Sequence, residues 1–131
     1  MPSDFEVSSP MPASPATVFS TWMSSEGHSA MTGGDASVDA RVGGAYTAWN
    51  GYIQGRTIEL EAPTRIVQSW RTTDFTADDE DSRIDVRLAD HDGGTLVTIR
   101  HSNVPDGHDG YENGGWEQSY FGPMRAYFDA P

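Results

Sequence analysis

Two segments that alternate between apolar and polar residues flank a glycine-rich turn, and this pattern constrains the fold most. The segments are residues 83–89 and 95–102, and the turn is Asp92-Gly93-Gly94. A period of two on both sides of such a turn indicates an antiparallel hairpin with one buried face. The predicted inward residues are Ile84, Val86, Leu88, Val97, Ile99 and His101. The predicted outward residues are Arg83, Asp85, Arg87 and Arg100. A sheet with such a charged face can be covered on one side only.

Strand and turn signals continue over the whole region from Ala36 to His101. Within it, the stretch from Gly51 to Arg71 predicts two strands joined by a turn at Pro63. Residues 4–9 also alternate, and they predict a first strand ended by Pro10. The strands expected after Ala36 span residues 38–41, 45–49, 52–61, 64–71, 83–89 and 95–102.

Two short helices are expected between the first strand and the others. Ser14 followed by Pro15 provides an N-cap and a proline at the first helical position. Ser24 is placed to cap a second helix that runs to about Met31 and ends at the Gly33-Gly34 pair. Apolar residues at helical spacing give the first helix one buried side; they are Val18, Phe19, Trp22 and Met23.

The last segment, from about residue 109 to 128, has a stripe of large apolar residues typical of a helix. The Gly122-Pro123 pair argues against an uninterrupted helix, so we expect a kink or break near Gly122. An apolar helix face and a one-sided sheet are best buried against each other. We therefore predict one α+β domain over residues 1–131, in which a curved antiparallel sheet of six to seven strands wraps around a long C-terminal helix.

The charge and composition exclude several classes of function. The chain has 20 acidic and 8 basic residues, for a net charge of −12, and this repels nucleic acids and anionic membranes. It has no cysteine, which excludes thiol chemistry and cysteine metal sites. The amino terminus lacks a basic and apolar leader, so we expect a cytoplasmic protein, with no cofactor implied.

Five acidic residues fall in one run, from Asp74 to Asp81. We interpret this run as a solvated loop. A cation site is the alternative, although the run lacks the alternating aspartates and distal glutamate of a calcium loop.

The order of these elements, together with several short motifs, resembles a known family. The motifs are residues 15–19, 42–46, 59–67, Trp70-Arg71, His101-Ser102 and Gly115-Trp116. They resemble the START-like, or helix-grip, superfamily and, within it, the family named after activators of the 90-kDa heat-shock-protein ATPase. The resemblance covers nearly the whole chain. It implies a cavity between sheet and C-terminal helix that accepts hydrophobic or amphipathic small molecules, and it makes a chaperone or another protein a candidate partner.

Nine residues are expected near that cavity. They are Trp22, Met31, Trp49, Arg56, Trp70, His101, Trp116, Tyr120 and Met124. Plain core packing is the alternative for the tryptophans and methionines. For His101, the alternative is a structural imidazole bonded to the backbone or a hydroxyl. Arg56 shares its parity with Leu60 and is expected to point inward as an anion anchor, unless a bulge near Gly55 reverses it.

No constellation of catalytic or metal-ligating residues is recognisable. The four histidines, His28, His91, His101 and His108, show no paired ligand spacing, and His91 and His108 fall in turns or glycine-rich loops. Nucleophile-elbow, dinucleotide and P-loop motifs are absent from the sequence. The leading hypothesis is therefore non-enzymatic binding of a small hydrophobic molecule. A protein-interaction module and a cyclase- or hydrolase-like enzyme that uses His101 are the alternatives.

Overall fold

The computed structural model describes residues 3–105, 107, 109–111 and 114–129, and its element order is the predicted one. The strands are β1 (Ser3–Met11), β2 (Ser37–Val38), β3 (Ala45–Ala48), β4 (Ile53–Glu61), β5 (Arg65–Thr72), β6 (Ser82–His91) and β7 (Gly94–Val104). The helical segments are α1 (Pro15–Trp22), α2 (Ser25–Thr32), the 3-10 turn η1 (Asp109–Tyr111), the π-helical η2 (Glu117–Phe121) and α3 (Gly122–Asp129).

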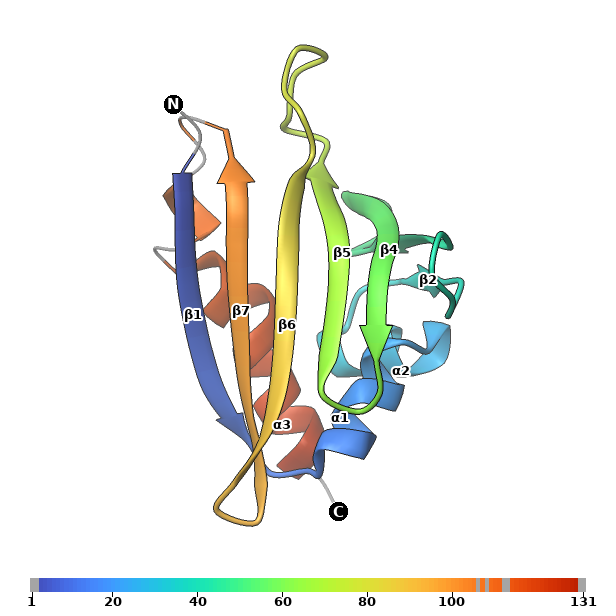
Figure 1. The fold of residues 1–131 in the computed structure, drawn as a ribbon, viewed down its shortest axis with the longest axis vertical. Coiled ribbons are helices and arrows are strands. Elements are labelled where there is room, and N and C mark those ends of the chain that lie inside the picture. Colours follow the sequence, from blue (N-terminus) through green and yellow to red (C-terminus); the bar gives the residue numbers. More distant parts are fainter. Residues whose placement is uncertain (1–2, 106, 108, 112–113, 130–131) are drawn as a thin grey trace.

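The strands form a seven-stranded antiparallel sheet in the order β1-β7-β6-β5-β4-β3-β2 (Figure 1). β1 extends through Pro10 to Met11, beyond the predicted end of the strand. A proline is tolerated there because β1 is an edge strand and pairs on one side only. β2 is shorter than predicted because the chain turns at Arg41–Gly44, where Gly44 N–H bonds to the Arg41 carbonyl.

The two faces of the sheet differ as the alternation predicts. Ile84, Val86, Val97 and Ile99 are fully buried. On the outer face, Arg65 binds the Asp85 carboxylate with two hydrogen bonds of 3.1 and 2.9 Å. The predicted one-sided antiparallel sheet is therefore confirmed.

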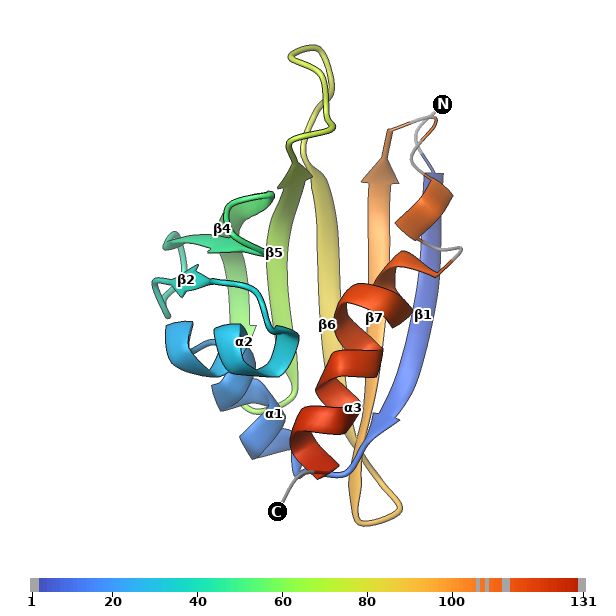
Figure 2. The ribbon, with the colours of Figure 1, turned by 180° about the vertical axis from the view of Figure 1, so that it is seen from behind.

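The helices cover the apolar face. Figure 2 shows α3 running across β1, β7 and β6, with α1 and α2 beside it. The predicted caps are present: Ser14 Oγ accepts from Thr17 N–H, and Ser24 Oγ accepts from Gly27 N–H. α2 ends at Gly33, whose φ of 88° is the left-handed conformation that glycine adopts without strain.

The C-terminal helix differs from the prediction in two respects. Its continuous part begins at Gly115, not near residue 109. It also runs to Asp129 without a break at Gly122, and the irregularity expected there takes the form of a π-helical stretch just before it. The chain accommodates Gly122-Pro123 by widening the preceding turn into a π-helix, in which Gly122 N–H bonds to the Glu117 carbonyl five residues back.

Candidate functional site

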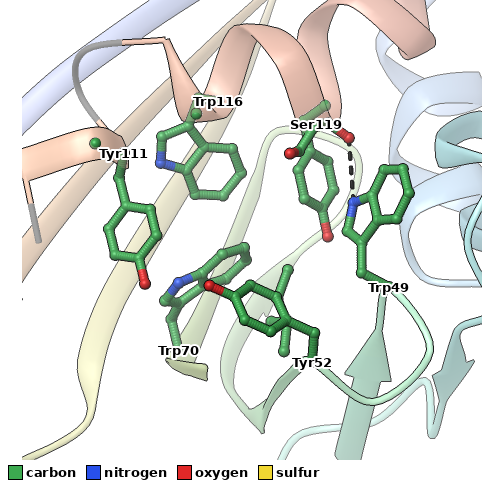
Figure 3. A pocket seen from close by; sticks show the side chains of 10 residues that line it. Trp49, Tyr52, Trp70, Tyr111, Trp116 and Ser119 are labelled. Atoms are coloured by element: carbon green, nitrogen blue, oxygen red, sulfur yellow. Dashed lines mark hydrogen bonds between the residues drawn. The ribbon is translucent and has the colours of Figure 1, made fainter. Parts of the chain in front are cut away.

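A pocket of about 450 Å³ lies where the β3–β4 turn, the end of β5, η1 and the first turns of the C-terminal helix meet. It is open to solvent on one side, and its wall is mainly aromatic. In Figure 3, rings from all four segments surround a common space. The aromatic wall consists of Trp49, Tyr52, Trp70, Tyr111, Trp116 and Tyr120.

Trp49 is held in place by an unusual turn. Its φ is 51°, a left-handed conformation that is uncommon for a bulky residue. The turn is fixed to the segment after α2, because Asn50 N–H bonds to the Asp35 carbonyl and the Asn50 side chain accepts from Asp35 N–H. The indole N–H of Trp49 donates to the Ser119 carbonyl oxygen at 3.2 Å. These contacts position the ring as one side of the pocket.

Tyr120 is positioned by a buried histidine. His28 is 1% exposed, and its Nδ1 lies 2.9 Å from the Trp22 carbonyl oxygen, so Nδ1 carries the proton. His28 Nε2 therefore accepts from the Tyr120 hydroxyl, also at 2.9 Å. Burial lowers the pKa of His28, which keeps the ring neutral, although the bond to the Trp22 backbone acts in the opposite direction.

Trp116 is positioned by a second buried histidine. Its indole N–H donates to His101 Nδ1 at 3.2 Å, which places the histidine proton on Nε2. Nε2 in turn lies 2.8 Å from Ser82 Oγ, and Ser82 donates to the Trp70 carbonyl oxygen at 2.7 Å. Burial lowers the pKa of His101 to about 3, so this chain of hydrogen bonds holds a neutral imidazole.

The indole nitrogen of Trp70 has no hydrogen-bond partner among the described residues, although the side chain is only 3% exposed. It differs in this from the other aromatic residues of the wall. The Tyr52 hydroxyl donates to Asp74, and the Tyr111 hydroxyl pairs with Thr72 at 3.1 Å. An unpaired buried donor costs about 1–3 kcal/mol. The nitrogen itself has almost no accessible surface, so it does not face the open space of the pocket.

Four of the nine residues expected near a cavity line this pocket: Trp49, Trp70, Trp116 and Tyr120. Trp22, Met31 and Met124 do not line it and pack in the core instead. His101 does not line it either, since both ring nitrogens bond to neighbouring side chains behind Trp116. The space beneath the helix is thus filled, and the pocket lies at one end of it.

The prediction that Arg56 points inward is wrong. Arg56 is exposed, and its guanidinium donates to the Gly43 carbonyl oxygen at 3.0 Å. The neighbouring Ile53 and Thr57 are buried instead. The pairing of β4 with β5 shifts register between Thr57 and Glu59, so the parity counted from Leu60 reverses before Arg56 is reached.

Residues of the site that were not among those expected include His28, Tyr52 and Tyr111. His28 has polar neighbours in the sequence, and only the packing of α2 against the C-terminal helix shows that it is buried. Tyr52 follows Asn50-Gly51, a turn signal that could have placed it next to Trp49. No pattern in the sequence indicates that Tyr111 belongs to the site.

The sequence is also similar to a known family over most of its length. The family model described as "Activator of Hsp90 ATPase homolog 1-like protein" matches residues 12–129. The chain belongs to this family. At the level of sequence search, no curated protein is significantly similar to it.

Solved structures of other proteins share the fold of this chain. An HSP90 activator from Plasmodium falciparum is 23% identical, covers 98% of this chain and 97% of its own, and has a TM-score of 0.86. Protein CV1439 from Chromobacterium violaceum is 24% identical over the whole of both chains, with a TM-score of 0.78. The protein Ara h 8.0201 is 16% identical over 96% of this chain and 97% of its own, with a TM-score of 0.72. At these identities the likeness shows the helix-grip fold alone.

Within the described residues, no group of three or more histidine, aspartate or glutamate side chains could hold a metal ion. The 73–81 loop is organised by Arg71, which bonds to the Thr76 and Asp79 carbonyls and to the Asp81 carboxylate. His91 is partly exposed beside Asp92. His108 lies outside the described residues.

No helix in the described part of the chain is long and apolar enough to cross a membrane.

Proposed function

We propose that this protein binds a small hydrophobic or amphipathic molecule in the aromatic pocket, without catalysis. The observation that carries this proposal is the pocket itself, a half-open space of about 450 Å³ walled by six aromatic side chains. Ligand pockets are of this size and composition, with few polar groups in a mostly apolar wall.

The wall is organised before any ligand arrives. Trp49, Trp116 and Tyr120 are each fixed by a hydrogen bond from their only side-chain polar atom to another part of the chain. Side chains that are already ordered lose little conformational entropy on binding. This order supports the interpretation of the pocket as a ligand site and not as a gap left by incomplete packing.

Binding is tested by screening a library of small apolar and amphipathic molecules against the purified protein, by native mass spectrometry and by tryptophan fluorescence. Ser119→Trp places a large ring at a lining position and is expected to abolish binding. Gln118→Trp is the matched control, because Gln118 is exposed and does not line the pocket. A library that yields no ligand, or ligands that bind Ser119→Trp as well as wild type, would rule the proposal out.

A chaperone is a second candidate partner, favoured by the match to the Hsp90 ATPase activator homologue family. The acidic chain would then bind a basic surface, and binding would weaken steeply as salt screens the charges. Measurement of chaperone ATPase activity at low ionic strength tests this. Unchanged ATPase activity at saturating concentrations of this protein would eliminate it.

An enzymatic role through His101 has less support. Its Nδ1 accepts from Trp116 and its Nε2 is bonded to Ser82, so neither nitrogen faces the pocket. A ligand carbonyl in the pocket could not be polarised by His101 without breaking one of these bonds. We therefore do not assign His101 a catalytic role.

A further inference from the structure

We infer that the pocket selects an organic cation, such as a substituted ammonium. This inference rests on the proposed function and specifies the chemistry of its ligand. It follows from two features of the site: the aromatic wall and a carboxylate at its rim.

The wall offers π faces and no competing positive charge. None of the ten lining residues is an arginine, a lysine or a histidine. The faces of tryptophan and tyrosine rings carry partial negative charge and attract cations, most strongly where water is excluded. Six such rings around one space form the kind of site in which ammonium groups bind.

A carboxylate stands at the rim of this aromatic wall. Asp74 is exposed and accepts a hydrogen bond from the Tyr52 hydroxyl, which lines the pocket. Its charge also acts on Tyr111, another lining residue. The nearest arginine along β5, Arg71, is held by the carbonyls of Thr76 and Asp79 and by Asp81, so it does not neutralise Asp74. A cation at the mouth is therefore stabilised, and an anion is repelled.

Three probes of one shape separate these contributions. They are para-hydroxybenzyl trimethylammonium, its uncharged isostere para-neopentylphenol, and the anion para-hydroxybenzyl sulfonate. We expect the cation to bind roughly ten-fold more tightly than the neutral isostere, and the anion to bind least tightly, as measured by calorimetry or tryptophan fluorescence.

One variant assigns the preference to the carboxylate at the rim. Asp74→Asn removes the rim charge and is expected to lower the cation-to-neutral affinity ratio about three-fold. Asp92→Asn is its matched control, because it removes the same charge from the β6–β7 turn at the opposite end of the sheet (Figure 1), and it is expected to leave the ratio unchanged.

Several results would overturn the inference. One is a neutral isostere or an anion that binds as tightly as the cation; if that binding is still lost in Ser119→Trp, the proposed function survives without the cation preference. Another is an equal effect of Asp74→Asn and Asp92→Asn, which would make the preference a property of the net charge. If neither these probes nor any library compound binds, both the inference and the proposed function fail.

Discussion

The indole N–H of Trp49 donates to the carbonyl oxygen of Ser119, four residues before Pro123 (Figure 3). In an α-helix that carbonyl would accept the N–H of the residue four positions later, and a proline has none. Trp49 thus supplies the donor that Pro123 cannot. One hydrogen bond stabilises both the π-helical stretch and the aromatic wall of the pocket.

Trp49→Phe is expected to destabilise the protein by about 1–2 kcal/mol, because the Ser119 carbonyl loses its donor while the ring is largely kept. Urea denaturation measures this. Pro123→Ala supplies a backbone N–H in place of the indole, so the double variant should lose less than the sum of the two single variants. Strict additivity would contradict the link between Trp49 and Pro123.

Gly34→Ala is expected to displace Trp49. A β-carbon at position 34 would lie 2.6 Å from the Trp49 ring, far inside contact distance. Overpacking of this kind costs about 1–3 kcal/mol, and here it should also change the tryptophan fluorescence and weaken ligand binding. Gly33→Ala is the control: a side chain there meets nothing within 4 Å, so it should cost about 1 kcal/mol through its positive φ alone. Equal binding by the two variants would contradict the role given to Trp49.

Stability is expected to fall as the medium becomes acidic. Burial lowers the pKa of His101 to about 3 from an ordinary value of 6.5, and the pKa of His28 is lowered in the same direction. Below pH 6.5 the unfolded chain therefore binds protons that the folded chain does not. His101 alone should cost about 2 kcal/mol between pH 8 and pH 5.

The measurement is the free energy of unfolding as a function of pH. His101→Gln should be less stable than wild type at neutral pH but should show a shallower decline on acidification. His91→Gln, which removes a partly exposed histidine, should follow the wild-type curve. Parallel curves for wild type and His101→Gln would show that His101 is not kept neutral by the fold.

Local patterns in the sequence were sufficient to predict the fold. The alternation in β6 and β7, the serine caps of α1 and α2, and the glycine after α2 are all read within a few residues. The π-helical stretch was missed because its stability depends on Trp49, which is 70 residues away in sequence from Ser119. Such long-range contacts leave no periodic signal.

The site was predicted only in part for the same reason. Large aromatic residues in a sequence predict burial, but they do not show whether a given ring fills the core or lines a pocket. Trp22 and Trp70 therefore cannot be distinguished from the sequence. In the structure Trp22 donates to buried Gln68 at 3.1 Å, whereas the Trp70 nitrogen is left unpaired in the described part of the chain. The Arg56 side chain faces outward, not inward as expected, because of a single shift in strand register that the sequence does not reveal.

The most direct test of ligand binding in the aromatic pocket is the nitrogen–proton NMR spectrum of the isotopically labelled protein, in which the four tryptophans give separate indole N–H signals. Saturation with a ligand found in the library screen should move the signals of Trp49, Trp70 and Trp116, whose rings line the pocket. The Trp22 signal should hardly move, since Trp22 packs in the core and does not line the pocket. A bound ligand that leaves all three lining signals unchanged would contradict the account.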